Sequence, residues 1–323
     1  MTNIIAILQW AEDSLLSHGY TIKARPEDVQ TTPWSCVKRF LTSDGYIYLK
    51  QTPPGLSLEP AITQILYDQF HANVPCIIAA DKILNCFLMK DAGNPLRDFL
   101  KGNFQPDLLC QAIKTYTAIQ YAVTAKLTIF TELGVPDWRL KELPRLYSEF
   151  ISQEALLKED GLTQNELILL HKLSPQFSAM CEHLSRYKIP ETLDHCDFHD
   201  NNILIEDGTY HMTIIDLGET VVTHPFFSLL TCIRNARFRY ALKETDEIYL
   251  GLQDACLDGH LFELEQRNIL LEAFSLAEKL WPIYASLGEY RLMMSSNPEK
   301  YQSLNRRGRL VMGFKEFIKT TTL

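Results

Sequence analysis

A stretch near the middle of the chain gathers side chains that can bind a cation and accept a proton. Residues 191–220, ETLDHCDFHDNNILIEDGTYHMTIIDLGET, hold two short apolar runs joined by a turn at Glu206-Asp207-Gly208, which predicts a β-hairpin. Asp197 and Asn202 stand where the first run begins, and Asp216 ends the second. We therefore expect two carboxylates and one amide to converge at this hairpin.

These oxygen-bearing side chains suit phosphoryl chemistry. Mg²⁺ takes few protein oxygens besides those of substrate phosphates, and one carboxylate with one amide meets that demand. A second carboxylate is then left to orient a hydroxyl and accept its proton while a phosphoryl group is transferred. The alternative interpretation is that Asp, Asn and Gly gather here only because they favour turns.

The first ninety residues have the pattern of a small antiparallel sheet behind an amphipathic N-terminal helix. CVKRFL (36–41) and YIYLKQ (46–51) are β-rich runs separated by an Asp-Gly turn. PCIIAAD (75–81) and NCFLMKDAG (85–93) give two more strands, and residues 61–70 have helical spacing of apolar residues between the two pairs.

Beyond Gly93 the apolar residues recur mostly at helical spacing, and Thr163-Gln164-Asn165-Glu166 is a capping box that opens one of the helices. No internal repeat or low-complexity linker separates the two parts of the chain. We therefore expect an α+β protein with a small sheet lobe over 1–91 and a mainly helical lobe over 92–323 that pack directly on each other.

The motif at the hairpin resembles a known family. HCDFHDNN (195–202) matches the H-x-D-x-x-x-x-N pattern of the kinase-like fold, and its additional His199 is similar to the H-G-D-x-H-x-x-N form of the aminoglycoside phosphotransferase and choline kinase group. Ile215-Asp216-Leu217-Gly218 resembles the D-F-G of protein kinases or the I-D-W/F of small-molecule kinases. The resemblance implies a two-lobed protein-kinase-like fold.

The resemblance also implies roles for these residues. Asp197 would be the catalytic base, and Asn202 and Asp216 would be the Mg²⁺ ligands. His195 would be architectural. His199 would either shape the loop or touch substrate, and we favour the first of these roles.

The sheet lobe offers a cation for the nucleotide. YIYLKQ resembles the strand that carries the V-A-I-K lysine of kinases, so Lys50 would contact the α- and β-phosphates. A solvated lysine on an alternating strand is the alternative. By the same resemblance Glu59 would orient Lys50 from the next helix, although it stands at the helix start, where a carboxylate also interacts favourably with the helix dipole.

Two segments resemble the rest of a nucleotide site. No G-x-G-x-x-G precedes the lysine, and TTPWS (31–35) stands where a nucleotide-covering loop would be, with Ser35 as a phosphate donor. The run that ends the last strand of the lobe resembles a hinge: Met89 would line the base pocket, and the backbone from Lys90 to Ala92 would bond the base. A buried strand leading into a turn explains the same run without a ligand.

The chain departs from the family pattern after the metal aspartate. THPFFSL (223–229) stands where aminoglycoside kinases show G-D-P-x-x-D-L-A, so both acids are missing. The second acid normally braces the catalytic loop; Ser228 or His224 must brace it differently, or the bracing is absent. Asp137-Trp138-Arg139 receives no role. Four acidic residues of the C-terminal part would either line a site for a cationic acceptor or form a solvated face: Asp246, Glu247, Asp254 and Asp258.

The composition of the chain argues against some classes of binding partner. The chain has 323 residues, 31 basic and 40 acidic, and a formal charge of −9, so no basic excess is present for binding a nucleic-acid backbone. Its eight cysteines contain no C-x-x-C pair, which favours a reducing cytoplasm over a zinc site or a disulfide framework. No apolar run approaches the length of a membrane helix, and the N-terminus lacks the basic segment of a signal peptide.

Together these features predict a phosphotransferase that uses ATP or GTP with Mg²⁺ and acts on a hydroxyl of a small molecule. A kinase-like binding or scaffold protein without turnover is the alternative, favoured by the missing glycine loop and by the absent acids. A further alternative is an enzyme of the same fold that transfers another group, such as a nucleotidyl moiety.

Overall fold

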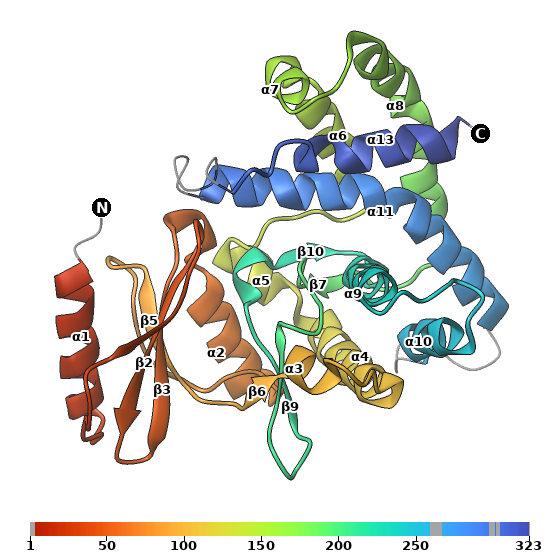
Figure 1. Cartoon of the computed structure of the whole chain (residues 1–323). Helices are drawn as coiled ribbons and strands as arrows, with labels where there is room; N and C mark the ends of the chain where they lie inside the picture. The colour runs from red at the N-terminus through yellow and green to blue at the C-terminus, as the bar shows by residue number, and fades with distance from the viewer. Residues whose placement is uncertain (1–3, 259–266, 297–300, 302–303, 323) are drawn as a thin grey trace. The chain divides into compact units, whose positions relative to one another are not determined.

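The computed structural model describes residues 4–258, 267–296, 301 and 304–322 (Figure 1). The chain divides into two compact units, and neither unit is continuous in sequence. The sheet unit comprises Met1–Pro95, Leu204–Gly218 and Leu292–Leu304. The helical unit comprises Leu96–Ile203, Glu219–Arg291 and Asn305–Leu323.

The sheet unit is built on an antiparallel sheet of five strands in the order β1-β2-β3-β5-β4. The strands are β1 (Glu27–Thr31), β2 (Cys36–Thr42), β3 (Gly45–Gln51), β4 (Ile77–Asp81) and β5 (Cys86–Lys90). The predicted hairpin forms with Thr42 opposite Gly45, and Gly45 has a φ of 99°, which glycine adopts without strain.

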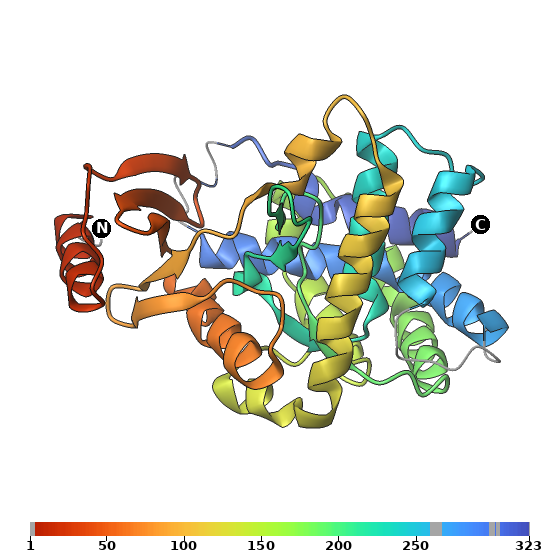
Figure 2. The ribbon, with the colours of Figure 1, turned by 90° about the horizontal axis from the view of Figure 1, so that it is seen from below.

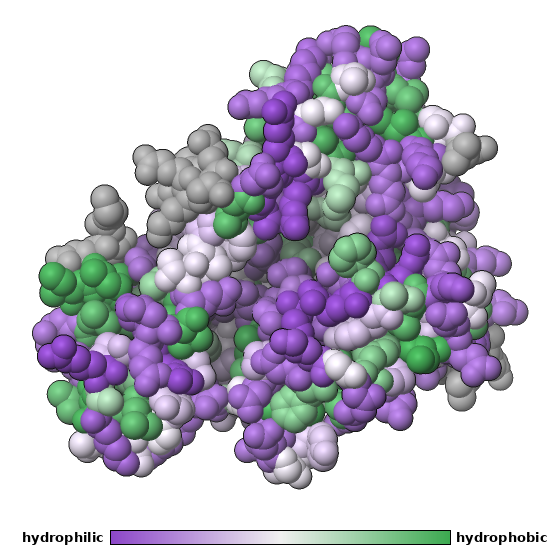
Figure 3. All heavy atoms as spheres, in the orientation of Figure 1, coloured by the Kyte–Doolittle hydropathy of each residue, from purple (hydrophilic) through white to green (hydrophobic). Residues whose placement is uncertain are grey.

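Two helices accompany this sheet. Helix α1 (Ile4–Ser17) buries Ile7, Ala11 and Leu15 in one core with alternate residues of β3 and β5. Lys50 lies on the other face of β3 and donates to Glu59 at the start of α2 (Glu59–Phe70). Because side chains alternate between the two faces of a strand, one face of β3 belongs to the core and the other carries the polar site. The outer face of α1 exposes apolar side chains, which are green at the left of Figure 3.

A second, smaller sheet joins distant segments in the order β6-β8-β9: β6 (Asn94–Pro95), β8 (Ile203–Ile205) and β9 (Met212–Ile214). Strands β8 and β9 are the predicted hairpin. Gly93, just before β6, has a φ of 110°, and a Cβ on it would stand 2.3 Å from the backbone oxygen of Ile205. Only glycine lets the two backbones approach so closely here.

The helical unit contains a two-stranded sheet of β7 (Thr192–Asp194) and β10 (Val221–Thr223), paired antiparallel. Helix α10 (Glu247–Leu257) packs beside α4 (Pro106–Val123) (Figure 2). The predicted capping box opens α8 (Gln164–Ser185). The helices that the unit contains, or in the case of α11 largely contains, are α3 (Leu96–Leu100), α4 (Pro106–Val123), α5 (Thr128–Leu133), α6 (Leu143–Ile151), α7 (Glu154–Glu159), α8 (Gln164–Ser185), α9 (Phe226–Arg239), α10 (Glu247–Leu257), α11 (Arg267–Ser295) and α13 (Arg309–Thr321).

The segment Asp137-Trp138-Arg139 serves to hold strand β10. The backbone N–H of Trp138 donates to the Val222 carbonyl, and the Thr223 hydroxyl donates to the carbonyl of Trp138. Arg139 pairs with Asp137 at 2.5 Å. The segment is therefore a structural clamp.

None of the described helices combines the length and the apolar character that crossing a lipid bilayer requires.

Candidate active site

The loop between β7 and β8 carries the predicted catalytic residues and holds Asp197 from two sides. The Asn202 amide nitrogen donates to the backbone oxygen of Asp197 at 2.9 Å and to its Oδ2 at 3.1 Å. The Nε2 of His199 lies 3.3 Å from Oδ1. The Asp197 side chain nevertheless remains 46% exposed, so its carboxylate is oriented and still accessible to a ligand.

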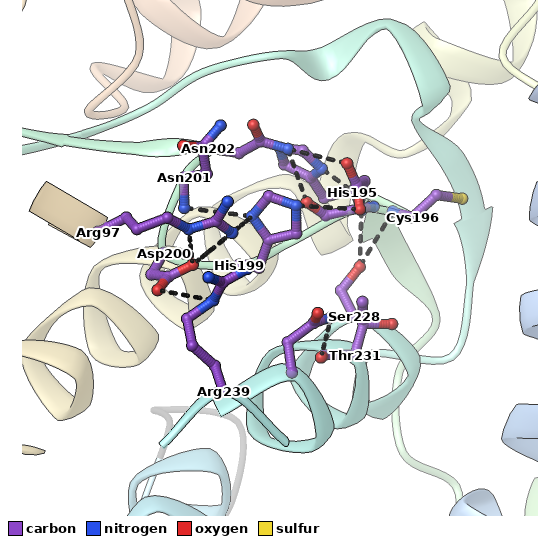
Figure 4. Close-up of polar contacts among 12 residues, drawn as sticks. Arg97, His195, Cys196, His199, Asp200, Asn201, Asn202, Ser228, Thr231 and Arg239 are labelled. Atoms are coloured by element: carbon purple, nitrogen blue, oxygen red, sulfur yellow. Dashed lines mark hydrogen bonds and ion pairs between the residues drawn. The ribbon is translucent and has the colours of Figure 1, made fainter. Parts of the chain in front are cut away.

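The base of this loop is braced by Ser228 and Asp194. The Ser228 hydroxyl accepts from the backbone N–H groups of His195 and Cys196 at 3.0 and 3.1 Å (Figure 4). The same hydroxyl donates to Asp194 Oδ1 at 2.7 Å. The Ser228 N–H donates to Asp194 Oδ2 at 2.9 Å. The bracing that the missing family acid left open is therefore present, and it uses a serine on α9 together with a carboxylate on β7.

Asp194 is fully buried, and no motif in the sequence points to it. Burial raises the pKa of Asp194 to about 6, although the hydroxyls of Tyr284 and Ser228 donate to the carboxylate and oppose that rise. Tyr116 adds a further hydrogen bond to the network, because its hydroxyl oxygen accepts from the N–H of His195 at 2.9 Å. These partners are dispersed along the chain, and no motif joins them.

His195 and Cys196 set the backbone that leads into Asp197. The His195 ring is buried, and its Nδ1 accepts from the N–H of Asp197 at 3.3 Å, which is the architectural position that the resemblance implied. Cys196 has a φ of 67° and stands where the family form has glycine. The loop therefore keeps a left-handed turn there with a residue that adopts it less readily.

His224 does not brace the loop. Its ring is fully buried, and Nδ1 accepts from the N–H of Phe226 at 3.3 Å, while Nε2 has no hydrogen-bond partner among the described residues. Burial lowers the pKa of His224 to about 3, so the imidazole is neutral at physiological pH.

His199 is held in one orientation by its neighbours. Its Nδ1 accepts from the N–H of Asn201 at 3.2 Å and lies 3.4 Å from Nη2 of Arg97. Two donors on Nδ1 leave the proton on Nε2, which therefore donates to Asp197. Burial lowers the pKa of His199, but the carboxylate of Asp197 outweighs that effect and raises it above its ordinary value.

Asp200, also not predicted, anchors the far side of the same loop. Its Oδ1 accepts from Nε and Nη2 of Arg97 at 2.9 and 2.7 Å, and its Oδ2 accepts from the hydroxyl of Tyr240 at 2.6 Å. Burial alone would raise the pKa of Asp200, but these bonds lower it below its ordinary value. In the sequence, Asp200 stands among residues that favour turns and is read as one of them. Its partners Arg97 and Tyr240 are distant in sequence and are seen only in the folded chain.

The sheet unit brings Lys50, Glu59 and Asp216 together. The Nζ of Lys50 donates to Glu59 Oε1 at 2.7 Å and to Asp216 Oδ1 at 2.6 Å. Lys50 is only 6% exposed, which excludes the solvated lysine that the alternating strand left open. Burial alone would lower the pKa of Lys50, but the two carboxylates raise it well above its ordinary value, so the ammonium stays charged.

The two carboxylates differ in their surroundings. Glu59 is 3% exposed, and burial raises its pKa to about 7 against the opposing charge of Lys50. The Asp216 side chain is 43% exposed and its φ is 65°. A positive φ at a residue other than glycine is costly and concentrates at functional sites.

The remaining predicted nucleotide contacts lie in the same unit. Ser35 closes a turn with Thr32, their hydroxyl oxygens 3.0 Å apart. Met89 is partly buried near the end of β5, and the N–H of Lys90 already donates to the Cys76 carbonyl at 3.0 Å. For the N–H of Ala92 no protein acceptor occurs in the described part of the chain, so Ala92 can donate to a base edge.

The donor chemistry of Asn202 and Asp216 fits Mg²⁺. Asn202 uses its amide nitrogen on Asp197, which leaves its side-chain oxygen as the possible ligand, and Asp216 presents a partly exposed carboxylate. The described residues contain no group of three or more His, Cys, Asp or Glu side chains arranged for a metal. Mg²⁺ usually takes one or two protein oxygens and keeps waters and substrate phosphates as its other ligands.

The acidic residues of the C-terminal part behave as surface groups. Asp254 pairs with Arg267, and Asp258 lies 3.8 Å from the same guanidinium. Asp246 is the residue before α10 and accepts from the N–H of Lys243 at 2.8 Å. These contacts favour the solvated face over an acidic acceptor site.

The sequence and the fold of this chain are compared with those of known proteins. A search of curated protein sequences returns no match. Solved structures that share the fold include the following three. The GDP complex of aminoglycoside 2'-phosphotransferase-IIIa is 14% identical with a TM-score of 0.62 and covers 97% of this chain and 99% of its own. Ethanolamine kinase from Plasmodium vivax is 15% identical with a TM-score of 0.61, over 86% and 84%. Macrolide 2'-phosphotransferase type I is 12% identical with a TM-score of 0.60, over 98% of each chain.

These similarities confirm the predicted protein-kinase-like fold. The model of the phosphotransferase enzyme family matches residues 37–282, which is well over half of the chain and includes Lys50, the braced loop and Asp216. The predicted class, an enzyme that transfers a phosphoryl group to a small molecule, is thereby confirmed, and this chain belongs to the phosphotransferase enzyme family.

Proposed function

We propose that this phosphotransferase moves the γ-phosphoryl group of ATP or GTP to a hydroxyl of a small molecule, with Asp197 as the catalytic base. The observation that carries this proposal is the fixed but accessible carboxylate of Asp197, held by Asn202 and His199 with 46% of its side chain exposed. A base must be oriented on the hydroxyl and must also be reachable by it.

Each oxygen of the Asp197 carboxylate has one hydrogen bond from the loop, to Oδ2 from Asn202 and to Oδ1 from His199. A carboxylate oxygen has two lone pairs, so each keeps one for an acceptor hydroxyl. The hydroxyl proton passes to Asp197 as the new oxygen–phosphorus bond forms and the bond from γ-phosphorus to the bridging oxygen breaks. His199 positions the base in this step through its contact with Oδ1.

Lys50 is the proposed cation for the α- and β-phosphates. Glu59, almost fully buried, holds the Lys50 ammonium in place, and the hydrogen bond to Asp216 shows how close this cation lies to the proposed metal ligand. A lysine held by buried partners loses little further side-chain entropy when phosphate binds.

Asn202 and Asp216 are the proposed ligands of Mg²⁺. They belong to different units, so each assignment rests on its own surroundings and on the family motif. When bound, Mg²⁺ would neutralise charge on the nucleotide phosphates. The turn at Ser35, the side chain of Met89 and the backbone from Lys90 to Ala92 complete the proposed nucleotide contacts.

The cytoplasm is the proposed compartment, because all eight cysteines are free thiols. Nucleotide and a small hydroxyl compound are the proposed partners, in line with the absence of a basic excess in the composition.

Product analysis tests the proposal. The full chain is incubated with ATP or GTP, with and without Mg²⁺, and the nucleoside diphosphate and pyrophosphate released are measured separately. We expect Mg²⁺-dependent diphosphate release that falls at least about 100-fold in Asp197→Asn, while the Mg²⁺-dependent thermal shift with nucleotide is kept. The exposed Asp68→Asn is the matched control.

Turnover in Asp197→Asn equal to that of the wild type would remove Asp197 as the base. Release of pyrophosphate instead of diphosphate would show nucleotidyl transfer, the alternative left open by the sequence.

A further inference from the structure

A pocket of about 450 Å³ lies in the helical unit, within the size range of small-molecule sites. Its walls come from α3, from the loop that follows α3 and from the end of α9. Three of its lining side chains are basic and two are aromatic: Arg97, Lys101, Arg239, Phe104 and Tyr240.

This pocket is connected to the catalytic loop by direct contacts. Arg97, which lines it, lies 3.4 Å from Nδ1 of His199, whose Nε2 contacts Asp197. Tyr240, which lines the pocket from the end of α9, donates to Asp200 of the same loop at 2.6 Å. Two side chains in contact, Arg97 and His199, therefore connect the pocket to the proposed base Asp197.

The pocket is lined by more positive side chains than the neighbouring carboxylates pair with. The side chain of Asp200 is 6% exposed and is satisfied by Arg97 and Tyr240. Arg239 stands 3.7 Å from Asp200, too far for a hydrogen bond, and its side chain is 43% exposed (Figure 4). The donors of Arg239 are thus available to a ligand.

The rest of the lining contributes the ammonium of Lys101 and the aromatic rings of Phe104 and Tyr240. Lys101 and Asp98 are both exposed, so the lining holds three cations against one anion of its own, with Asp200 behind it. The rings of Phe104 and Tyr240 stack with centroids 4.0 Å apart and an interplanar angle of 14°. A stacked pair of this kind presents a π-face and ring edges to a planar group.

We propose that this pocket binds the phosphoryl acceptor and that the acceptor is a small anionic molecule with an oxyanion group and a flat ring besides its hydroxyl. The guanidinium of Arg239 and the ammonium of Lys101 would bind the oxyanion, and the aromatic wall would bind the ring. This inference rests on the proposed function, because it makes the pocket the acceptor site of Asp197.

Binding of matched probes tests the inference without nucleotide. Three compounds share one ring and one hydroxymethyl group and differ in charge: 4-(hydroxymethyl)benzoate is negative, 1,4-benzenedimethanol is neutral and 4-(aminomethyl)benzyl alcohol is positive. Titration calorimetry on the full chain is expected to show the benzoate binding at least about tenfold more tightly than the neutral compound, with the amine weakest. The phosphate counterpart, 4-(hydroxymethyl)phenyl phosphate, decides which oxyanion is preferred.

Arg239→Gln removes one lining charge and should abolish most of the benzoate's advantage. Arg186→Gln, at an exposed arginine that does not line the pocket, is the matched control and should leave that advantage intact. Melting temperatures of both variants near that of the wild type confirm that they fold.

Equal binding of the three probes, a preference for the amine, or no binding of any of them at millimolar concentration would overturn the inference, as would equal effects of the two arginine variants. The proposed function fails separately. If the benzoate binds but turnover does not depend on Asp197, the ligand class stands and the base is wrong. If turnover depends on Asp197 but the charge preference is absent, only the acceptor class is wrong.

Discussion

Ser228→Asp, which restores the acid of the family pattern, should destabilise this chain. The Ser228 hydroxyl lies 2.7 Å from Asp194 Oδ1, and both residues are fully buried. A carboxylate at position 228 could still accept from the N–H groups of His195 and Cys196, but it would face the charge of Asp194. Two unit charges about 4 Å apart repel by about 4 kcal/mol at an effective dielectric constant near 20. Because the pKa of Asp194 is about 6, its protonation would relieve this repulsion at a cost of only about 1.4 kcal/mol at pH 7 but of about 4 kcal/mol at pH 9. We therefore expect a loss of about 3 to 4 kcal/mol at pH 9, where the unfolding is measured.

The second change, Asp194→Ser, should recover most of this loss, because it leaves a single carboxylate in the network. Urea unfolding of both single variants and of the double variant, followed by far-UV circular dichroism, gives the coupling free energy, which should be about 3 kcal/mol in favour of the double variant. Ser228→Ala, which only loses hydrogen bonds, should cost about 2 kcal/mol. A stable Ser228→Asp variant, or a double variant no more stable than it, would refute the repulsion argument.

Three further outcomes are expected. Because the pKa of His224 is lowered to about 3, the unfolded chain binds a proton first as the pH falls below about 6.5. Stability should then drop between pH 7 and pH 5 by about 2 kcal/mol more in the wild type than in His224→Asn; equal losses in urea unfolding would contradict this. Lys50→Met leaves the buried carboxylate of Glu59 unpaired and should cost about 3 to 5 kcal/mol in the same assay; a loss below about 1 kcal/mol, as for an exposed pair, would be evidence against a buried ion pair. Gly93→Ala should cost more than about 2 kcal/mol because its Cβ meets a backbone oxygen, whereas Gly19→Ala, with a φ of 85° and open space, should cost only about 1 kcal/mol; equal melting temperatures would exclude the steric explanation.

The local part of the candidate site could be predicted from the sequence. Asp197, His199 and Asn202 lie within six residues, so one loop conformation brings them together and a short motif records it. Lys50 and Glu59 are nine residues apart, and the resemblance to the family named Glu59 as the partner of Lys50. Motifs succeed where the chain between the members is short.

The braces could not be predicted, because their members are distant in sequence. Asp194 is 34 residues from Ser228 and 90 from Tyr284, and Arg97 is 103 residues from Asp200. A buried carboxylate selects its partners in three dimensions, and no period or spacing along the chain records that choice. The only sign of this bracing in the sequence was Ser228, which stands where the G-D-P-x-x-D pattern has its second acid.

The domain division at residue 91 stays a prediction. The compact sheet unit also contains Leu204–Gly218 and Leu292–Leu304, partly because the backbones at Gly93 and Ile205 meet. The chain therefore returns to the sheet unit after it has entered the helical unit.

That return has a consequence for biosynthesis. Lys50 and Asp216 are separated by 166 residues, and at about 5 to 20 residues per second a ribosome needs roughly 8 to 33 seconds between them. During that interval the nascent sheet can bury its core against α1, but the site around Lys50 has only Glu59 as a partner. A fragment ending near residue 95 should therefore resist proteolysis less than the full chain, and ribosome-bound chains should gain protection only after the β8–β9 hairpin emerges.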